Sequence, residues 1–178
     1  VLFRSSVPHA SDDKFFELNE RINFDYRISS NHNLNLNVLL NYAHEKPKDD
    51  LASKHAGFEV AGFPRKKTSV VSGLTYEAKL FNSKLTNMLS AKHYYLHSKI
   101  DDLTSYEIST PPKQKENTAL QFGWIEAMKY EPFNGFHLKA SYQRAIRLPN
   151  SKELFGDGII TFPAAGLKPE KSHNFNLG

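Results

Sequence analysis

The stretch "NLNLNVLLNYA", residues 33–43, alternates apolar and polar side chains with a period of two. The apolar set is Leu34, Leu36, Val38, Leu40 and Tyr42, and the polar set is Asn33, Asn35, Asn37 and Asn41. A period of two places the two sets on opposite faces of a β-strand. Because Asn is a poor strand former, a face that carries so many of them needs a hydrated partner. The stretch therefore predicts a long strand with one apolar and one wet face.

The same alternation recurs along the chain. It is found in residues 21–28, 67–81, 116–131 and 136–142, and it returns near residue 172. Residues 84–100 resist a clean assignment but have the length of a further strand. No amphipathic helix of any length is apparent. The pattern therefore predicts an all-β chain of about seven strands, several of them longer than the usual strand of soluble sheets.

The connections between these segments come in two sizes, and the sizes alternate. Short turns carrying Asn or Gly fall at residues 29–33, 82–84 and 132–135. Long links rich in Pro, Lys, Asp and Gly span about 45–66, 101–115 and 148–170. Strands joined alternately by tight turns and long links form an up-and-down antiparallel meander.

Two architectures fit such a meander. In a soluble sandwich the apolar face would meet a second sheet, whereas in an outer-membrane barrel it would meet lipid and the polar face would line a wet lumen. Aromatic residues stand at the strand ends, as in the girdles of such barrels: Tyr42, Phe81, Tyr130, Phe133 and Phe136. Long strands, wet faces and loops of alternating size favour part of a transmembrane β-barrel.

Composition narrows the class of protein further. Aromatic residues make up 12% of the 178 residues, which is too many for a disordered chain. The absence of Cys excludes disulfides and thiolate metal sites. The net charge of +4 is modest, and its basic clusters fall in turn-rich stretches typical of solvated loops, so no nucleic-acid partner is expected.

The end of the chain carries the most specific motif. Its elements are Tyr142, Arg147 and Pro149, then Glu153-Leu154-Phe155-Gly156, then Leu167, Pro169, Glu170 and Ser172, and then an alternating stretch that reaches Gly178. In order and spacing they resemble a loop in the barrel of TonB-dependent outer-membrane receptors. The chain departs from the family pattern at Leu148, where Ala is usual, and at Ala165-Gly166, where Asn-Pro is frequent.

The resemblance implies a barrel of about 22 strands in the outer membrane, plugged by a separate N-terminal domain. Such receptors import scarce ligands with energy passed on by TonB. The implied partners are membrane lipid, TonB, the plug domain and a small ligand such as a siderophore or a glycan. Residues 148–169 contain no His, which argues against haem. About seven strands cannot close such a wall, so residues 1–178 are expected to be a partial barrel, truncated at both ends and without the plug.

The charges of the closing loop call for partners. Pro149 stops the hydrogen-bonded ladder, and Arg147 offers donors in a fixed fork that Glu153 or Glu170 could accept. The pair could pin the loop over the barrel, or it could contact the ligand or the plug. Aromatic residues in the long links could also serve a siderophore or a sugar: Phe58, Phe63, Tyr106, Phe155 and Phe162.

No nucleophile and base pair, phosphate loop or paired-carboxylate motif stands out, so no enzyme, no cofactor and no metal site is expected. Two other function classes stay open at this point. One is an outer-membrane barrel without energised transport, such as an adhesin, and the other is a soluble β-rich binding module. A plug domain and a TonB-binding segment in the flanking sequence would separate the receptor from both.

Overall fold

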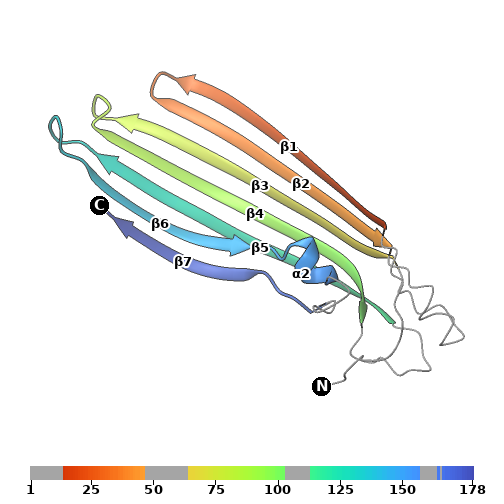
Figure 1. The fold of residues 1–178 in the computed structure, drawn as a ribbon. Helices are drawn as coiled ribbons and strands as arrows, with labels where there is room; N and C mark the ends of the chain where they lie inside the picture. Colours follow the sequence, from red (N-terminus) through yellow and green to blue (C-terminus); the bar gives the residue numbers. More distant parts are fainter. Residues whose placement is uncertain (1–13, 47–63, 103–112, 157–163, 165) are drawn as a thin grey trace, which may run out of the picture.

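The computed structural model describes residues 14–46, 64–102, 113–156, 164 and 166–178. They form seven strands and one short helix (Figure 1). The elements are β1 (Lys14–Ser29), β2 (His32–Lys46), β3 (Arg65–Leu80), β4 (Leu85–Asp102), β5 (Lys113–Tyr130), β6 (Leu138–Arg147), α2 (Ser151–Phe155) and β7 (Glu170–Leu177). Within these ranges, no helix has the length and apolar character needed to cross a membrane.

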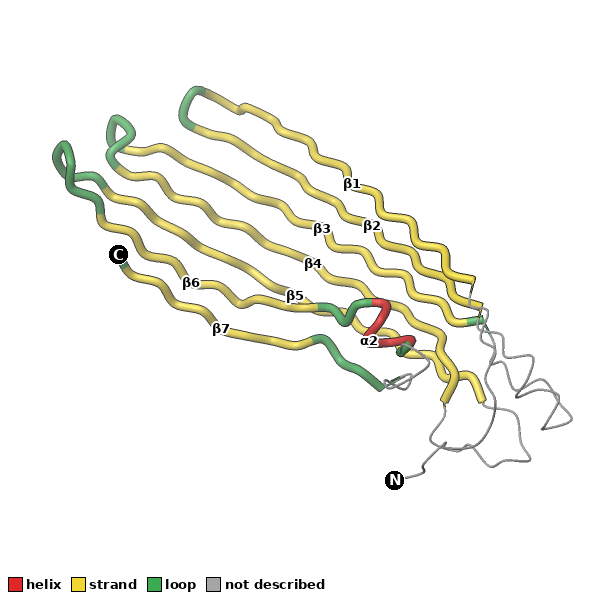
Figure 2. Tube along the Cα trace, in the orientation of Figure 1, coloured by secondary structure: helices red, strands yellow, loops and turns green. Residues whose placement is uncertain are grey.

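All seven strands lie in one sheet in the order of the sequence, and each pairs antiparallel with the next. The short turns lie together at one end of the sheet, while the strand ends that flank the long links lie together at the other (Figure 2). The predicted all-β, up-and-down meander is therefore confirmed. The first and last strands leave the sheet open, with β1 and β7 at its edges.

The strand boundaries differ from the expected ones in three places. The ambiguous residues 84–100 form a regular strand, β4, that continues to Asp102. The first strand begins at Lys14, well before residue 21, and β6 begins only at Leu138 because Phe136 and His137 belong to the preceding turn. The expectation of no helix is wrong at α2, which is too short to produce a visible period.

The register places the two sets of alternating residues on two distinct faces. Leu36 pairs with Phe24 and Leu74, whereas Asn35 pairs with Asp25 and Thr75. We call the face of Leu36 the apolar face and the face of Asn35 the polar face. The apolar face leaves large side chains uncovered, among them Ile22 at 65%, Phe24 at 60% and Phe122 at 58% exposure.

The polar face of β1 and β2 is joined by side-chain hydrogen bonds. Asn35 Nδ2 donates to Asp25 Oδ1 at 2.7 Å, and Asn37 donates in the same way to Asn23. Asn41 Nδ2 donates to both Glu17 at 2.6 Å and Asn19 at 2.8 Å. Three of the four Asn residues on the polar face of β2 are thus partnered across the strands.

Near the long-link end, β6 leaves the plane of the sheet. Its pairing with β5 stops at Trp124 and Arg144, although β4 and β5 stay paired as far as Asp102 and Lys113. At Gly123 a Cβ would lie 2.8 Å from the carbonyl oxygen of Arg144 and 3.5 Å from the Ile146 side chain. Glycine is therefore needed at this position, where β6 crosses onto the polar face of β5.

Candidate functional site: a clamped loop on the polar face

The helix α2 begins with a capping box. The side chain of Asn150 accepts a hydrogen bond from the Glu153 amide, and the Glu153 carboxylate accepts one from the Asn150 amide, both at 2.8 Å. This reciprocal pair satisfies two amides that a helix end would otherwise leave free. At the other end Gly156 has a φ of 78°, a conformation that glycine adopts without a Cβ penalty, and its amide donates to Lys152.

The far side of α2 packs onto the polar face of the sheet. Leu154 is fully buried and Phe155 is 2% exposed, and both contact a cluster formed by Ala43, Leu96 and Ile100. Partly buried side chains complete this cluster: Ala119, Leu148 and Leu167. Figure 1 shows α2 in front of β4 and β5, close to the long-link end. This cluster is an apolar patch on the polar face, and α2 covers it.

A second contact ties α2 to β3. Arg65 Nη1 donates to the carbonyl oxygen of Phe155 at 2.9 Å and to Glu45 at 3.1 Å. The side chains of Arg65 and Glu45 are only 11% and 13% exposed. The guanidinium therefore satisfies a helix-end carbonyl while its charge is neutralised by a carboxylate from β2.

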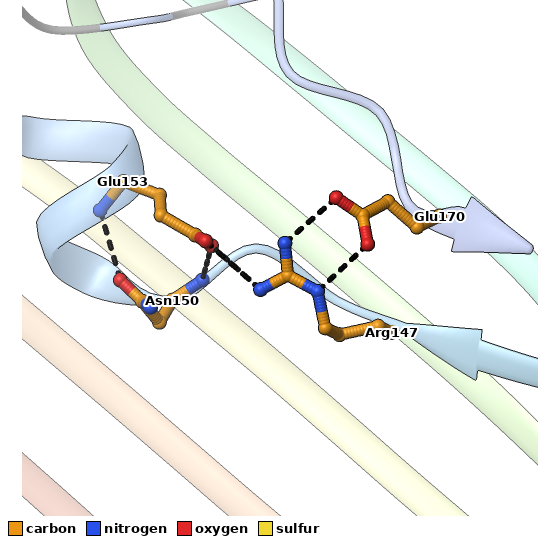
Figure 3. A network of polar contacts seen from close by, with 4 residues as sticks. All are labelled: Arg147, Asn150, Glu153 and Glu170. Carbon is orange, nitrogen blue, oxygen red and sulfur yellow. Dashed lines mark hydrogen bonds and ion pairs between the residues drawn. The ribbon is translucent and has the colours of Figure 1, made fainter.

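Arg147 lies between the two carboxylates that the sequence offered as partners, and it contacts both at once (Figure 3). Its Nε and Nη2 donate to the two oxygens of Glu170 at 2.9 and 2.7 Å, in a bidentate pair. Its Nη1 donates to Glu153 at 2.9 and 3.1 Å. One side chain at the end of β6 thus joins α2 to the start of β7.

Arg147, Glu153 and Glu170, which we call the clamp, lie at the surface of the loop between β6 and β7. The side chains of Arg147, Glu153 and Glu170 are 53%, 34% and 66% exposed. The Asn150 amide and, next, the Arg147 guanidinium hold the pKa of Glu153 below its ordinary value. All three guanidinium nitrogens of Arg147 donate to Glu153 or Glu170. These hydrogen bonds hold the loop in place, which is a structural role.

The remaining motif residues support the same arrangement. Pro149 and Gly156 are buried on either side of α2. Leu167 packs against the apolar patch, and its carbonyl oxygen accepts a hydrogen bond from Asn117 at 3.2 Å. Pro169 is half-buried directly before β7, where it marks the start of the ladder. The motif residues from Arg147 to Glu170 therefore lie in or beside one loop, whereas Tyr142 and Ser172 lie in the flanking strands β6 and β7.

Three contributors to this site were not expected from the sequence: Arg65, Asn117 and Asn150. Arg65 lies 90 residues from its partner Phe155, which no local pattern can connect. Asn150 stands three residues before Glu153, and that spacing is the signal of a capping box. Residues 84–100 show no clean alternation because Tyr94, Leu96 and Ile100 lie on the polar face, whereas His93 and Lys99 lie on the apolar face.

Of the five aromatic residues that could contact a ligand, the structure describes only Phe155. The ring of Phe155 is occupied by packing, since only 2% of it is exposed. Phe58, Phe63, Tyr106 and Phe162 lie outside the described residues. In the described ranges, no three His, Asp or Glu side chains gather in an arrangement that could hold a metal ion.

Comparison with protein families gives one match. Residues 97–178, from the second half of β4 to the end of β7, match the family described as TonB dependent receptor-like, beta-barrel. The match includes the clamped loop and confirms the resemblance that its motif indicates. No curated protein and no solved structure was found to match the chain.

Proposed function

We propose that this chain, whose residues 97–178 match the TonB-dependent receptor barrel, is part of the wall of an outer-membrane receptor that imports a scarce ligand. The family match is the observation that carries the proposal. The sheet supports it as well, because the matched strands continue without interruption into β1, β2 and β3. Residues 1–178 would then be a partial barrel, and the plug domain and TonB would be partners within the whole receptor.

The two faces of the sheet fit the two environments of a barrel wall. A band of exposed Phe, Leu, Ile and Tyr residues suits contact with lipid. The hydrogen-bonded Asn residues of the polar face suit a water-filled lumen. The apolar face therefore meets the membrane in this proposal, and the polar face lines the lumen.

The clamped loop would narrow the lumen at the outer mouth. Because α2 packs on the polar face, the loop folds inward rather than away from the wall. We assign Arg147, Glu153 and Glu170 to the holding of this fold. A contact with the plug or with the ligand is the competing role, and the exposed oxygens of Glu170 are the atoms that could make it.

The imported ligand is proposed only by class. A siderophore or a glycan fits a mouth lined by polar groups and loop aromatics. Phe155 is not available for such a contact, because its ring lies against the sheet.

The test is the behaviour of the receptor in a Gram-negative host. We expect it in the outer-membrane fraction, extracted only by detergent, and we expect it to be retained by immobilised TonB when its ligand is bound. A protein that stays monodisperse in plain buffer would instead be a soluble β-rich module. An outer-membrane protein that never binds TonB would be a barrel without energised transport.

A further inference from the structure

The apolar face changes its chemistry in steps toward the long-link end. On β2 to β5 one row of paired residues is apolar, namely Leu40, Val70, Tyr95 and Leu120. The next row offers hydroxyl and imidazole groups, namely Tyr42, Thr68, His97 and Thr118, and His97 and Thr118 are hydrogen-bonded at 3.0 Å. The third row holds the charged residues Lys66, Lys99 and Glu116 beside His44. The order runs from apolar groups through hydrogen-bonding groups to charges.

Cations stand directly opposite each other in this outer part of the face. Lys66 pairs with Lys99, and Lys14 pairs with Lys46. Like charges in directly opposed positions destabilise a strand pair unless an anion lies between them. Lys99 reaches Glu116 at 2.8 Å, but among the described residues no carboxylate lies within ion-pair distance of Lys66.

Basic residues continue along β6 and β7, but nearer to the short turns. Arg144 pairs with His173, and the next pair on the same face toward the short turns is aromatic, Tyr142 with Phe175. The border between apolar and basic residues therefore lies nearer to the short turns on β6 and β7 than on β2 to β5. The lipid-facing band of a barrel shifts in this way from strand to strand, because the strands are tilted in the membrane. We call Lys66, Lys99, Arg144 and His173 the basic collar; they lie along the border of that band that is nearer to the long links.

We propose that the basic collar binds the phosphate groups of anionic lipids in the membrane leaflet at the long-link end. This inference rests on the proposed function, since it needs the apolar face to meet lipid. Lys66 stands four positions before Val70, which is about 13 Å along a strand. On strands tilted by about 40° this is roughly 10 Å of depth, enough to reach from the hydrocarbon edge into the headgroup layer. A phosphate there accepts hydrogen bonds from both ammonium groups and separates the opposed charges.

A second pair of opposed lysines provides a matched control. Lys129 pairs with Lys139, but on the polar face and at the short-turn end. Lys129 also has its own carboxylate, Glu131, at 3.4 Å. Lipid cannot reach this pair if the apolar face is the one that meets the membrane.

The experiment compares lipid retention by the whole receptor in detergent. Phosphatidylglycerol and phosphatidylcholine are titrated separately, with the bound lipid counted by native mass spectrometry. We expect phosphatidylglycerol to bind more tightly, and the double variant Lys66→Gln, Lys99→Gln to weaken it by at least about fivefold. The variant Lys129→Gln, Lys139→Gln should leave its affinity unchanged.

Four results decide the inference. A loss confined to the Lys66 and Lys99 variant supports it. Equal affinity for the two lipids, or an equal loss in both variants, overturns it and leaves the proposed function intact. Displacement of the lipid by millimolar inorganic phosphate overturns it too, because the site would then take a free anion. A receptor that needs no detergent overturns both the inference and the proposed function.

Discussion

At the scale of single residues, the chemistry of the closing loop concentrates in Arg147. The chain breaks its ladder at Pro149, and the backbone groups freed there need other partners. Asn150 and Glu153 satisfy some of them through the capping box, and Arg147 fixes the Glu153 carboxylate from the other side. Lysine could not replace this side chain, because only the planar fork reaches two carboxylates at once.

Replacement of Arg147 should loosen the loop without unfolding the sheet. In Arg147→Ala we expect the amides of α2 to exchange roughly two- to fivefold faster, a small change because the cluster is exposed. Arg147→Lys should give nearly the same result, and Lys79→Ala, which removes an exposed cation from β3, should give none. Hydrogen exchange followed by mass spectrometry measures this in the receptor. Unchanged exchange together with lost ligand uptake would assign Arg147 to ligand binding instead.

The cap on α2 should depend on acid. The folded state lowers the pKa of Glu153, so its stabilising contribution is fully present at neutral pH. It should be lost as the pH falls through the folded-state pKa, below the ordinary value for Glu, where protonation weakens the bonds to Asn150 and Arg147. Amide exchange at α2, measured from pH 7 downward, should rise in this range. In Glu153→Gln the rise should disappear, and its persistence there would point to another group.

At the scale of elements, α2 is held mainly by packing. Its two buried side chains meet an apolar patch that β2, β4 and β5 contribute to the polar face. Burial of this kind contributes more than the exposed ion pairs beside it. The helix is only five residues long and would not form alone in water, so the sheet determines its position.

Truncation of the packed side chains should release α2. Leu154→Ala or Phe155→Ala should cost about 2 to 5 kcal/mol in the free energy that holds the loop on the sheet. Lys152→Ala, on the exposed side of the same helix, should cost little. Limited proteolysis of the receptor measures the difference as faster cleavage within residues 148–170. Equal cleavage of all three variants would contradict the packing of α2 on the polar face.

The two faces of β2 offer a second test at this scale. Arginine at Leu36 should cost roughly 2 to 4 kcal/mol if the residue lies near the middle of the bilayer, and much less at the adjacent Asn37. The reason is that lipid cannot solvate the charge, whereas a wet lumen can. Urea titrations of folding into lipid vesicles give both values. Equal tolerance at the two positions would contradict the assignment of the faces.

The sequence predicted the elements whose faces are chemically uniform. β2 alternates Leu and Asn and was clear, whereas β4 carries Leu96 on the polar face and was ambiguous. The helix α2 was missed because five residues span little more than one turn. The partners of Arg147 were expected from charge and proximity to Pro149, but the contact of Arg65 with α2 depends on strand register, which a single sequence does not contain.

At the scale of the whole molecule, the chain is one open sheet with two different faces. One face is apolar and uncovered, and the other is the polar face, on which α2 packs. The turns at one end are tight, and the clamped loop lies at the other, where α2 covers the polar face (Figure 1). A barrel in the outer membrane would direct these two ends to different compartments. We therefore expect the long links to lie outside the cell and the short turns to lie in the periplasm.

Cysteine labelling on intact cells tests this orientation most directly, because the chain has no Cys of its own. One cysteine replaces Lys113, beside a long link, and the other replaces Asn134, in a short turn. An impermeant thiol reagent should label the cysteine at position 113 on whole cells and the cysteine at position 134 only after permeabilisation. Labelling of position 134 but not 113 on intact cells would contradict the account.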